Sequence, residues 1–139
     1  MQRMQQEDVI REILSDINGG ERRVYFFYGK SGCGKTSTMY EISKRMRWYM
    51  YITFPGNAVL DHKVFKYRSP DIVEYDVTFY TDTKVIDRFI AEHSDSVIIV
   101  TSVLDPYSQF GFGRGSDEER EFCTKFKVYD MNTMKLIYS

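Results

Sequence analysis

The sequence has little that would point beyond one compact domain. Its 139 residues include only two cysteines and three prolines, and 19 basic side chains face 20 acidic ones, so the net charge is -1. Two cysteines make no disulfide or metal framework, and a balanced charge gives no overall field for nucleic acid or anionic membrane. No apolar run approaches the roughly 20 residues that span a bilayer, and residues 1–6 do not form a signal peptide. We therefore expect a single intracellular domain, residues 1–139, that does not bind membrane.

What the sequence does contain is an alternation of helical and strand-like segments. Short apolar or β-rich runs predict strands, and apolar residues at helical spacing predict helices. The predicted strands cover 24–28, 48–54, 71–77 and 96–101. The predicted helices cover 7–17, 35–47 and a segment with the apolar stripe Val85, Ile86, Phe89 and Ile90. The first helix belongs to a leading segment, 1–20, that packs on the core, 21–139, or on a neighbouring subunit.

The last third of the chain carries turn signals. Pro106 and three glycines predict that 102–115 is an extended surface loop, and Ser116 begins a capping box for a short helix. Residues 126–129 and 134–138 predict a terminal hairpin, whereas 58–70 fit no pattern. The abundant aromatic residues either fill the core or provide a stacking platform for bases.

A glycine-rich segment lies between the first predicted strand and the helix that follows it. Its pattern is Gly29, four residues, Gly34, Lys35 and Thr36, which is the signature of a phosphate-binding loop in its proper context. Glycines let backbone N–H groups turn toward phosphates, and the helix start adds a partial positive charge. We expect Lys35 to reach the β- and γ-phosphates of ATP and Thr36 to bind Mg²⁺. The predicted nucleotide-binding residues are Gly29, Lys30, Ser31, Gly32, Cys33, Gly34, Lys35, Thr36 and Ser37.

Two acidic residues in the third predicted strand are candidates for the remaining catalytic roles. Magnesium needs a second protein contact, and Asp76 ends this strand, where such an acid is expected. Asp76 is therefore the predicted second metal contact, the alternative being an aspartate that begins a loop. Glu74 is either a solvent-facing residue of a half-exposed strand or a carboxylate that orients the attacking water.

Other polar residues have weaker signals. Thr101 and Ser102 end the fourth predicted strand, where a hydroxyl either senses the γ-phosphate or caps the strand locally. Arg114 and Arg120 are either arginine fingers for a neighbouring subunit or solvated surface residues. The two histidines, His62 and His93, lack partners at metal-ligand spacing and are expected at the surface.

Taken together, these parts resemble the superfamily 3 helicase domain of replication-initiator proteins from circular single-stranded DNA viruses such as circoviruses and nanoviruses. The residues that carry the resemblance are GKSGCGKT at 29–36, DIVEYDVTFY at 71–80, VIIVTSVLDPYSQF at 97–110 and EEREFCTKFKVYD at 118–130. The third segment departs from the family, because Val103 stands where motif C ends in asparagine. The stretch between Asp76 and Val97 is also too short for the family's helix plus DNA-tracking hairpin.

The resemblance implies an α/β fold of three layers, a P-loop NTPase of the AAA+ and superfamily 3 helicase kind, with a mainly parallel central sheet and a C-terminal hairpin. It further implies an ATPase that remodels single-stranded nucleic acid during viral-type DNA replication, a ring of identical subunits, and the host nucleus as location. Two other functions stay open. One is a small nucleoside or metabolite kinase with 111–120 as a lid, and the other is a nucleotide-gated interaction module with little turnover.

Overall fold

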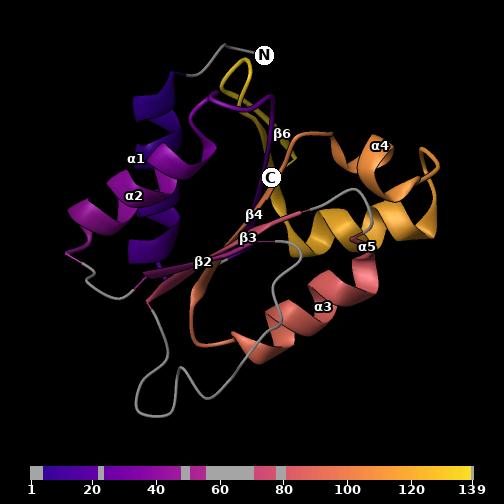
Figure 1. The fold of residues 1–139 in the computed structure, drawn as a ribbon, viewed down its shortest axis with the longest axis horizontal. Helices are drawn as coiled ribbons and strands as arrows, with labels where there is room; N and C mark the ends of the chain where they lie inside the picture. The colour runs from indigo at the N-terminus through magenta and orange to yellow at the C-terminus, as the bar shows by residue number, and fades with distance from the viewer. Residues whose placement is uncertain (1–4, 22–23, 48–50, 56–70, 78–80, 139) are drawn as a thin grey trace.

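The computed structural model describes residues 5–21, 24–47, 51–55, 71–77 and 81–138. Helices and strands alternate through most of this part of the chain (Figure 1). In chain order the elements are α1 (Gln6–Asn18), β1 (Val24–Tyr28), α2 (Lys35–Arg45), β2 (Tyr51–Pro55), β3 (Ile72–Asp76), α3 (Thr83–Glu92), β4 (Val97–Ser102), α4 (Pro106–Phe110), α5 (Asp117–Lys125), β5 (Lys127–Asp130) and β6 (Lys135–Tyr138).

The strands of the described residues form one mixed, mainly parallel sheet. Its order is β2-β3-β4-β1-β5-β6, and only the β5–β6 pair is antiparallel. The strands β2, β3 and β4 lie on one side of β1, whereas β5 and β6 lie on its other side. The chain therefore changes sides at β1, and in open parallel sheets ligands bind at the carboxyl ends of the strands at such a point.

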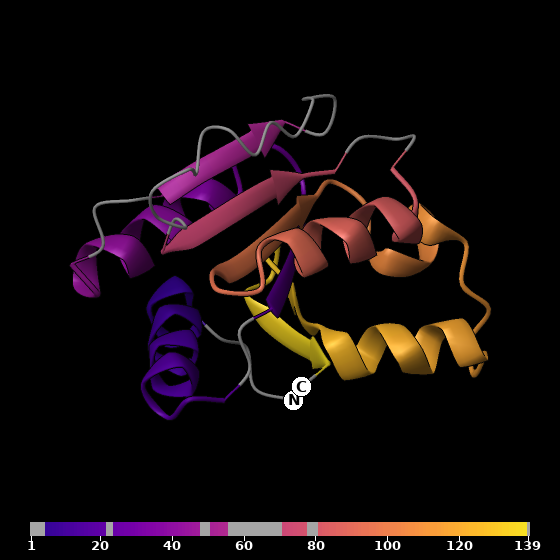
Figure 2. The ribbon, with the colours of Figure 1, turned by 90° about the horizontal axis from the view of Figure 1, so that it is seen from below.

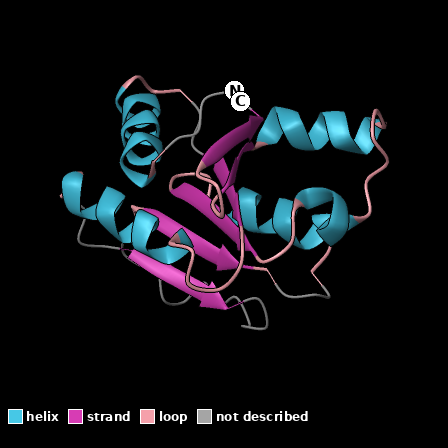
Figure 3. Cartoon of the chain, turned by 90° about the horizontal axis from the view of Figure 1, so that it is seen from above, coloured by secondary structure: helices cyan, strands magenta, loops and turns pink. Residues whose placement is uncertain are grey.

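Helices cover both faces of this sheet (Figures 2 and 3). On one face, α1 and α2 pack on alternate residues of the strands, among them Tyr25 and Phe27 of β1. On the other face, α3 and α5 pack on the intervening residues, among them Phe26. Because the central strands are covered on both sides, they are apolar along nearly their whole length. The expected α/β arrangement with a mainly parallel sheet and a terminal hairpin is confirmed.

Within the described ranges, most aromatic side chains contribute to these two cores. Phe26 makes edge-to-face contacts with the rings of Phe110, Phe122 and Phe126, at centroid distances of 6.1, 5.4 and 5.9 Å. Phe122 and Phe126 are stacked at 4.5 Å. The core interpretation of the aromatic residues is therefore confirmed for this cluster.

Most predicted elements are found, with small shifts at their ends. The leading helix packs on the domain itself, with Val9 and Ile13 fully buried against the core. The second helix ends at Arg45, two residues before the predicted end. Of the second predicted strand, residues 48–50 lie outside the described residues, as does the unassigned segment 58–70. Val85 is 39% exposed, so it does not belong to the buried stripe of α3.

The prediction of an extended loop over 102–115 is wrong in its middle, where α4 forms. Asp105 caps this helix by accepting a hydrogen bond from the Ser108 N–H at 3.0 Å, and Pro106 occupies its first turn. Proline is favoured there because its missing N–H would have no partner within the helix. Gly111 ends the helix with φ 71°.

His93 is also misplaced by the sequence-based prediction. It is 5% exposed rather than a surface residue, because it follows α3 and folds back on it. Its Nδ1 lies 2.9 Å from the carbonyl oxygen of Phe89, and the two rings are 4.4 Å apart. His62 lies outside the described residues. Among the helices described, none has the length and apolar character needed to cross a membrane.

Candidate functional site

The glycine-rich segment joins β1 to α2 in a tight turn. Gly34 precedes the helix with φ 103°, a backbone conformation that side chains with a Cβ rarely adopt. A Cβ on Gly29 would lie 2.6 Å from the Cys33 Sγ, so glycine is also required at the start of the turn. The first N–H groups of α2 lie at this turn, and residues from the start of α2 line one cavity together with the ends of β3 and β4. Those N–H groups have no acceptor within the helix and can receive an anion.

A cavity of about 420 Å³ opens at this turn. Its volume falls in the usual range for small-molecule sites, about 300–1,000 Å³. The loop supplies most of its wall, and the ends of β3 and β4 supply the rest. The lining residues are Ser31, Gly32, Gly34, Lys35, Thr36, Ser37, Asp76, Thr101 and Val103. The structure therefore brings most of the sequence-predicted site residues to one place.

Lys35 folds across the inside of the loop. Its Nζ donates hydrogen bonds to the carbonyl oxygens of Gly29 and, at 3.1 Å, Lys30. It also lies 3.9 Å from the Sγ of Cys33. The ammonium group is thus held at the centre of the turn, where a phosphate would meet it as a point charge.

Thr36 contacts an acid on the neighbouring strand. Its hydroxyl group donates to the Oε1 of Glu74 at 3.2 Å. Glu74 is only 1% exposed, because β3 is an inner strand and its alternate residues face α2. The interpretation of Glu74 as a solvent-facing residue is therefore wrong.

Asp76 ends β3 two residues later and is exposed at the cavity. It lies opposite Thr101 in the parallel pair β3–β4, and the Thr101 hydroxyl donates to its Oδ1 at 3.3 Å. A carboxylate and a hydroxyl group thus face the loop from two adjacent strand ends. Val103, which is 57% exposed, adds an apolar surface beside them.

Ser102 takes a different position from Thr101. Its hydroxyl group donates to the Leu104 carbonyl oxygen at 2.8 Å and accepts from the Leu104 N–H at 3.2 Å. It is fully buried and is not among the residues that line the cavity. Of the two sensor candidates, Thr101 borders the cavity, whereas Ser102 closes the end of β4.

The two arginine-finger candidates lie away from the phosphate loop of their own chain. Arg114 stacks over the Tyr107 ring, with 4.9 Å from its Cζ to the ring centroid. Arg120 donates to the Gly115 carbonyl oxygen at 3.2 Å and pairs with Asp117 at 3.8 Å. Neither lines the 420 Å³ cavity. Both therefore lie outside the phosphate site of their own chain.

Two residues that the sequence did not single out contact the loop region. The Gln6 side chain, at the start of α1, donates to the hydroxyl oxygens of Ser37 at 3.1 Å and Thr38 at 3.0 Å. Asn132, in the turn between β5 and β6, accepts a hydrogen bond from the Lys30 N–H at 3.0 Å. These partners are 31 to 102 residues apart along the chain, so no local sequence pattern predicts the contacts.

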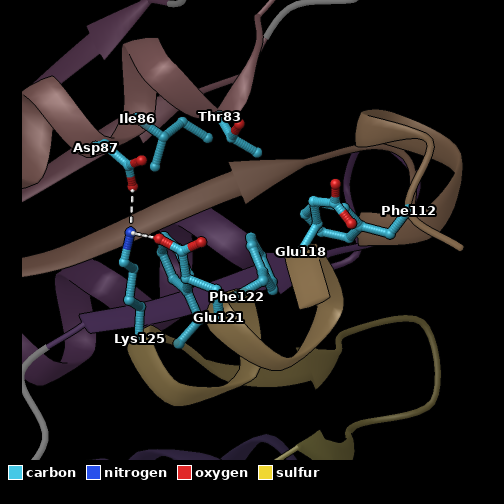
Figure 4. Close-up of a pocket in the computed structure, with 9 residues that line it drawn as sticks. Thr83, Ile86, Asp87, Phe112, Glu118, Glu121, Phe122 and Lys125 are labelled. Atoms are coloured by element: carbon cyan, nitrogen blue, oxygen red, sulfur yellow. Dashed lines mark hydrogen bonds and ion pairs between the residues drawn. The ribbon is translucent and has the colours of Figure 1, made fainter. Parts of the chain in front are cut away.

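A second, smaller cavity of about 70 Å³ lies between α3 and α5 (Figure 4). Lys125 spans it, with its Nζ 2.9 Å from the Oδ1 of Asp87 and 3.2 Å from the Oε1 of Glu121. The hydrogen bond to Asp87 is the main cause that raises the pKa of Lys125. This cavity shares no lining residue with the phosphate loop, and its floor is the aromatic cluster of Phe112, Phe122 and Phe126. We interpret it as packing between two helices.

The oxygen donors at the loop suit magnesium. Within the described ranges, no three His, Cys, Asp or Glu side chains gather into a metal-binding group. Mg²⁺ bound together with phosphates usually takes one or two protein ligands and keeps several waters. The Thr36 hydroxyl group beside Glu74 and Asp76 provides ligands of that kind.

Comparison with known proteins adds no relative. No protein-family model matches the chain, and no curated protein matches it significantly.

Proposed function

We propose that this protein is a P-loop NTPase that binds ATP with Mg²⁺ and hydrolyses it. The observation that carries the proposal is the single cavity at which Lys35 and Thr36, from the loop, meet Asp76 and Thr101, from the ends of two adjacent strands. The loop offers N–H groups and an ammonium group to a polyanion, and the strand ends offer groups that can act on a water molecule.

The contact between Thr36 and Glu74 suggests how magnesium would be held. A hydroxyl group has one proton and two lone pairs, and a metal ion needs a lone pair. Because the Thr36 hydroxyl donates its proton to Glu74, its lone pairs are left to face the cavity. Glu74 thus positions the Thr36 hydroxyl, as partners of metal ligands commonly do. When bound, Mg²⁺ would neutralise charge on the β- and γ-phosphates.

Asp76 is placed where it can contact a water molecule in the cavity. It is exposed to the cavity and accepts a hydrogen bond from Thr101. Besides the predicted role as second metal contact, we assign to Asp76 the orientation of the attacking water, with its carboxylate accepting a proton as the new oxygen–phosphorus bond forms. The bond from the γ-phosphorus to the bridging oxygen breaks, giving ADP and phosphate. Lys35 stabilises the charge on the departing groups.

The work coupled to hydrolysis is proposed from the family resemblance. The mainly parallel sheet, the loop after its first strand and the polar ends of β3 and β4 are compatible with the resemblance to the superfamily 3 helicase domain, so remodelling of single-stranded nucleic acid by a ring of subunits is the leading role. Within such a ring, Arg114 or Arg120 would serve the site of a neighbouring subunit. Their positions outside the cavity of their own chain are compatible with that role.

One observation favours a second function. Val103 places an apolar side chain at the cavity where the resembling family has an asparagine that contacts the γ-phosphate or its water. A site without that amide could bind nucleotide and turn it over slowly. The protein would then be a nucleotide-gated interaction module.

Steady-state hydrolysis, with and without single-stranded DNA, tests these proposals. The comparison uses wild type, Lys35→Ala and Asp76→Asn, with Arg88→Ala as a control because Arg88 pairs with Glu92 on an exposed helix face. We expect hydrolysis in wild type and the control, stimulation by the strand, and loss in both site variants. Hydrolysis that survives Lys35→Ala would refute the mechanism. Tight binding without turnover would instead support the gated module.

A further inference from the structure

We propose that the turn between β5 and β6 is a brace for the phosphate loop, and that Asn132 is the positioning residue of this brace. The inference rests on the proposed function, because it gives the turn a role in nucleotide retention. It concerns a segment that begins about 100 residues after the loop and would otherwise be only the tip of a terminal hairpin.

The brace consists of two hydrogen bonds that join the turn to the end of β1 and to the start of the loop. The Lys30 N–H donates to the Asn132 Oδ1 at 3.0 Å, and the Met131 N–H donates to the Tyr28 carbonyl oxygen at 2.8 Å. Asn132 is itself fixed, since its own N–H donates to the Asp130 Oδ1 at 3.0 Å. The turn is therefore tied on both sides of Gly29.

The packing at Gly29 is close enough to exclude a side chain. A Cβ there would lie 3.1 Å from the Asn132 Oδ1 and 3.2 Å from the Asn132 backbone nitrogen. On the other side of the loop, a Cβ on Gly34 would lie 3.7 Å from the Met134 Cε. The turn thus borders the loop near its beginning, at Gly29, and near its end, at Gly34.

The hydrogen bonds of Lys30 connect the brace to the lysine that meets phosphate. The Lys30 N–H is held by Asn132, and the Lys30 carbonyl oxygen accepts from the Nζ of Lys35. Fixing Lys30 therefore also fixes an acceptor that positions the ammonium group. Without Asn132, the exposed front of the loop would gain conformational freedom that nucleotide binding must remove.

This arrangement predicts an effect on nucleotide affinity rather than on the chemical step. Asn132 is not among the residues that line the cavity, so it touches neither the attacking water nor the γ-phosphate position. Losing one hydrogen bond that orders the loop should weaken nucleotide binding by roughly 5–10-fold. It should change kcat by less than about twofold, because the interactions that form only in the transition state are not affected.

The test compares wild type with Asn132→Ala, Asn132→Asp and the control Thr133→Ala, an exposed neighbour in the same turn. Amide hydrogen exchange of residues 29–36 is measured without nucleotide, and Kd, KM and kcat are measured with Mg²⁺ and ATP. We expect faster exchange and a higher Kd and KM in Asn132→Ala only. Asn132→Asp keeps an acceptor for the Lys30 N–H, so it should restore the protection of the loop.

The outcomes separate the brace from the proposed function. Loop exchange in Asn132→Ala equal to that in Thr133→Ala would overturn the brace, whatever the nucleotide data show. A loss of kcat with unchanged KM would overturn the positioning role. If wild type takes up no ATP, the proposed function fails with the nucleotide role of Asn132, and loop exchange alone then decides whether the turn braces the loop.

Discussion

Replacing Thr36 by valine removes a hydroxyl group while keeping the shape of the side chain. That hydroxyl group has two proposed tasks, which are to donate to Glu74 at 3.2 Å and to bind Mg²⁺. Thr36→Ser keeps the hydroxyl group and is therefore the matched control. The two variants together separate the loss of the hydroxyl group from the loss of a methyl group.

The expected magnitudes follow from the two tasks. Glu74 is 1% exposed, so water replaces the lost donor poorly, and a hydrogen bond to a charged acceptor contributes about 1.5–3 kcal/mol. Because Thr36 itself is exposed, we expect the lower part of that range in the free energy of unfolding. Disturbing the ligand set of a metal site typically weakens metal affinity by roughly 10–100-fold. The magnesium concentration for half-maximal ATP binding should rise by that factor.

Isothermal titration calorimetry with ATP, over a series of magnesium concentrations and in excess chelator, measures this effect. Wild type and Thr36→Ser should reach half of their magnesium-dependent gain in ATP affinity at similar magnesium concentrations, whereas Thr36→Val should need roughly 10–100-fold more magnesium. Urea denaturation of the three proteins checks that each is folded. If Thr36→Val keeps the magnesium dependence of wild type, the assignment of Thr36 and Glu74 to the metal is wrong.

Two further predictions concern stability. Burial acts to lower the pKa of Lys127, but its contacts with Asp16 at 2.8 Å and Glu12 at 2.7 Å outweigh burial and raise this pKa. The pKa of Tyr129 is also raised, because burial and the hydrogen bond to Glu12 both favour the protonated phenol. Both groups thus keep their protons to higher pH in the folded state, so the stability they contribute is present below the unfolded pKa values of about 10 and is lost as pH rises through the folded values. The urea midpoint should fall as the pH rises above about 10, less steeply in Tyr129→Phe, and a flat profile would contradict this. Phe122→Ala should lower the free energy of unfolding by about 3–5 kcal/mol, whereas Val85→Ala, at a 39% exposed position, should change it little; equal losses in the two variants would refute the assignment of Phe122 to the core.

The predicted fold agrees with the structure where the periodicity was long or the turn chemistry was explicit. The apolar stripe that includes Val9, Ile10 and Ile13 predicted α1. Ser116 predicted the start of α5, where its hydroxyl group accepts a hydrogen bond from the Glu119 N–H at 3.2 Å. The helix α4 was missed because its five residues are too few for a period, and the neighbouring glycines outweighed the Asp105–Pro106 signal. Burial of His93 depends on how it folds back on Phe89, which no local pattern encodes.

The phosphate loop could be predicted from the sequence more fully than the residues that contact it. The signature from Gly29 to Thr36 needs only local spacing, and its conformation agrees with that expectation. Separating the roles of Glu74 and Asp76 required knowing that Glu74 is buried within an inner strand beside Thr36, whereas Asp76 ends that strand at the cavity. The contacts of Gln6 and Asn132 depend on tertiary packing across long stretches of chain, so they could not be read from the sequence.

Calorimetric titration of the folded protein with ATP and Mg²⁺, comparing wild type with Lys35→Ala, tests the central claim most directly. The Lys35 ammonium group lies inside the turn, on the carbonyl oxygens of Gly29 and Lys30, where a phosphate would meet it. We predict magnesium-dependent uptake of one ATP per chain by wild type and no uptake by Lys35→Ala over the same concentrations. Absence of binding in wild type, or equal binding in both proteins, would contradict the account.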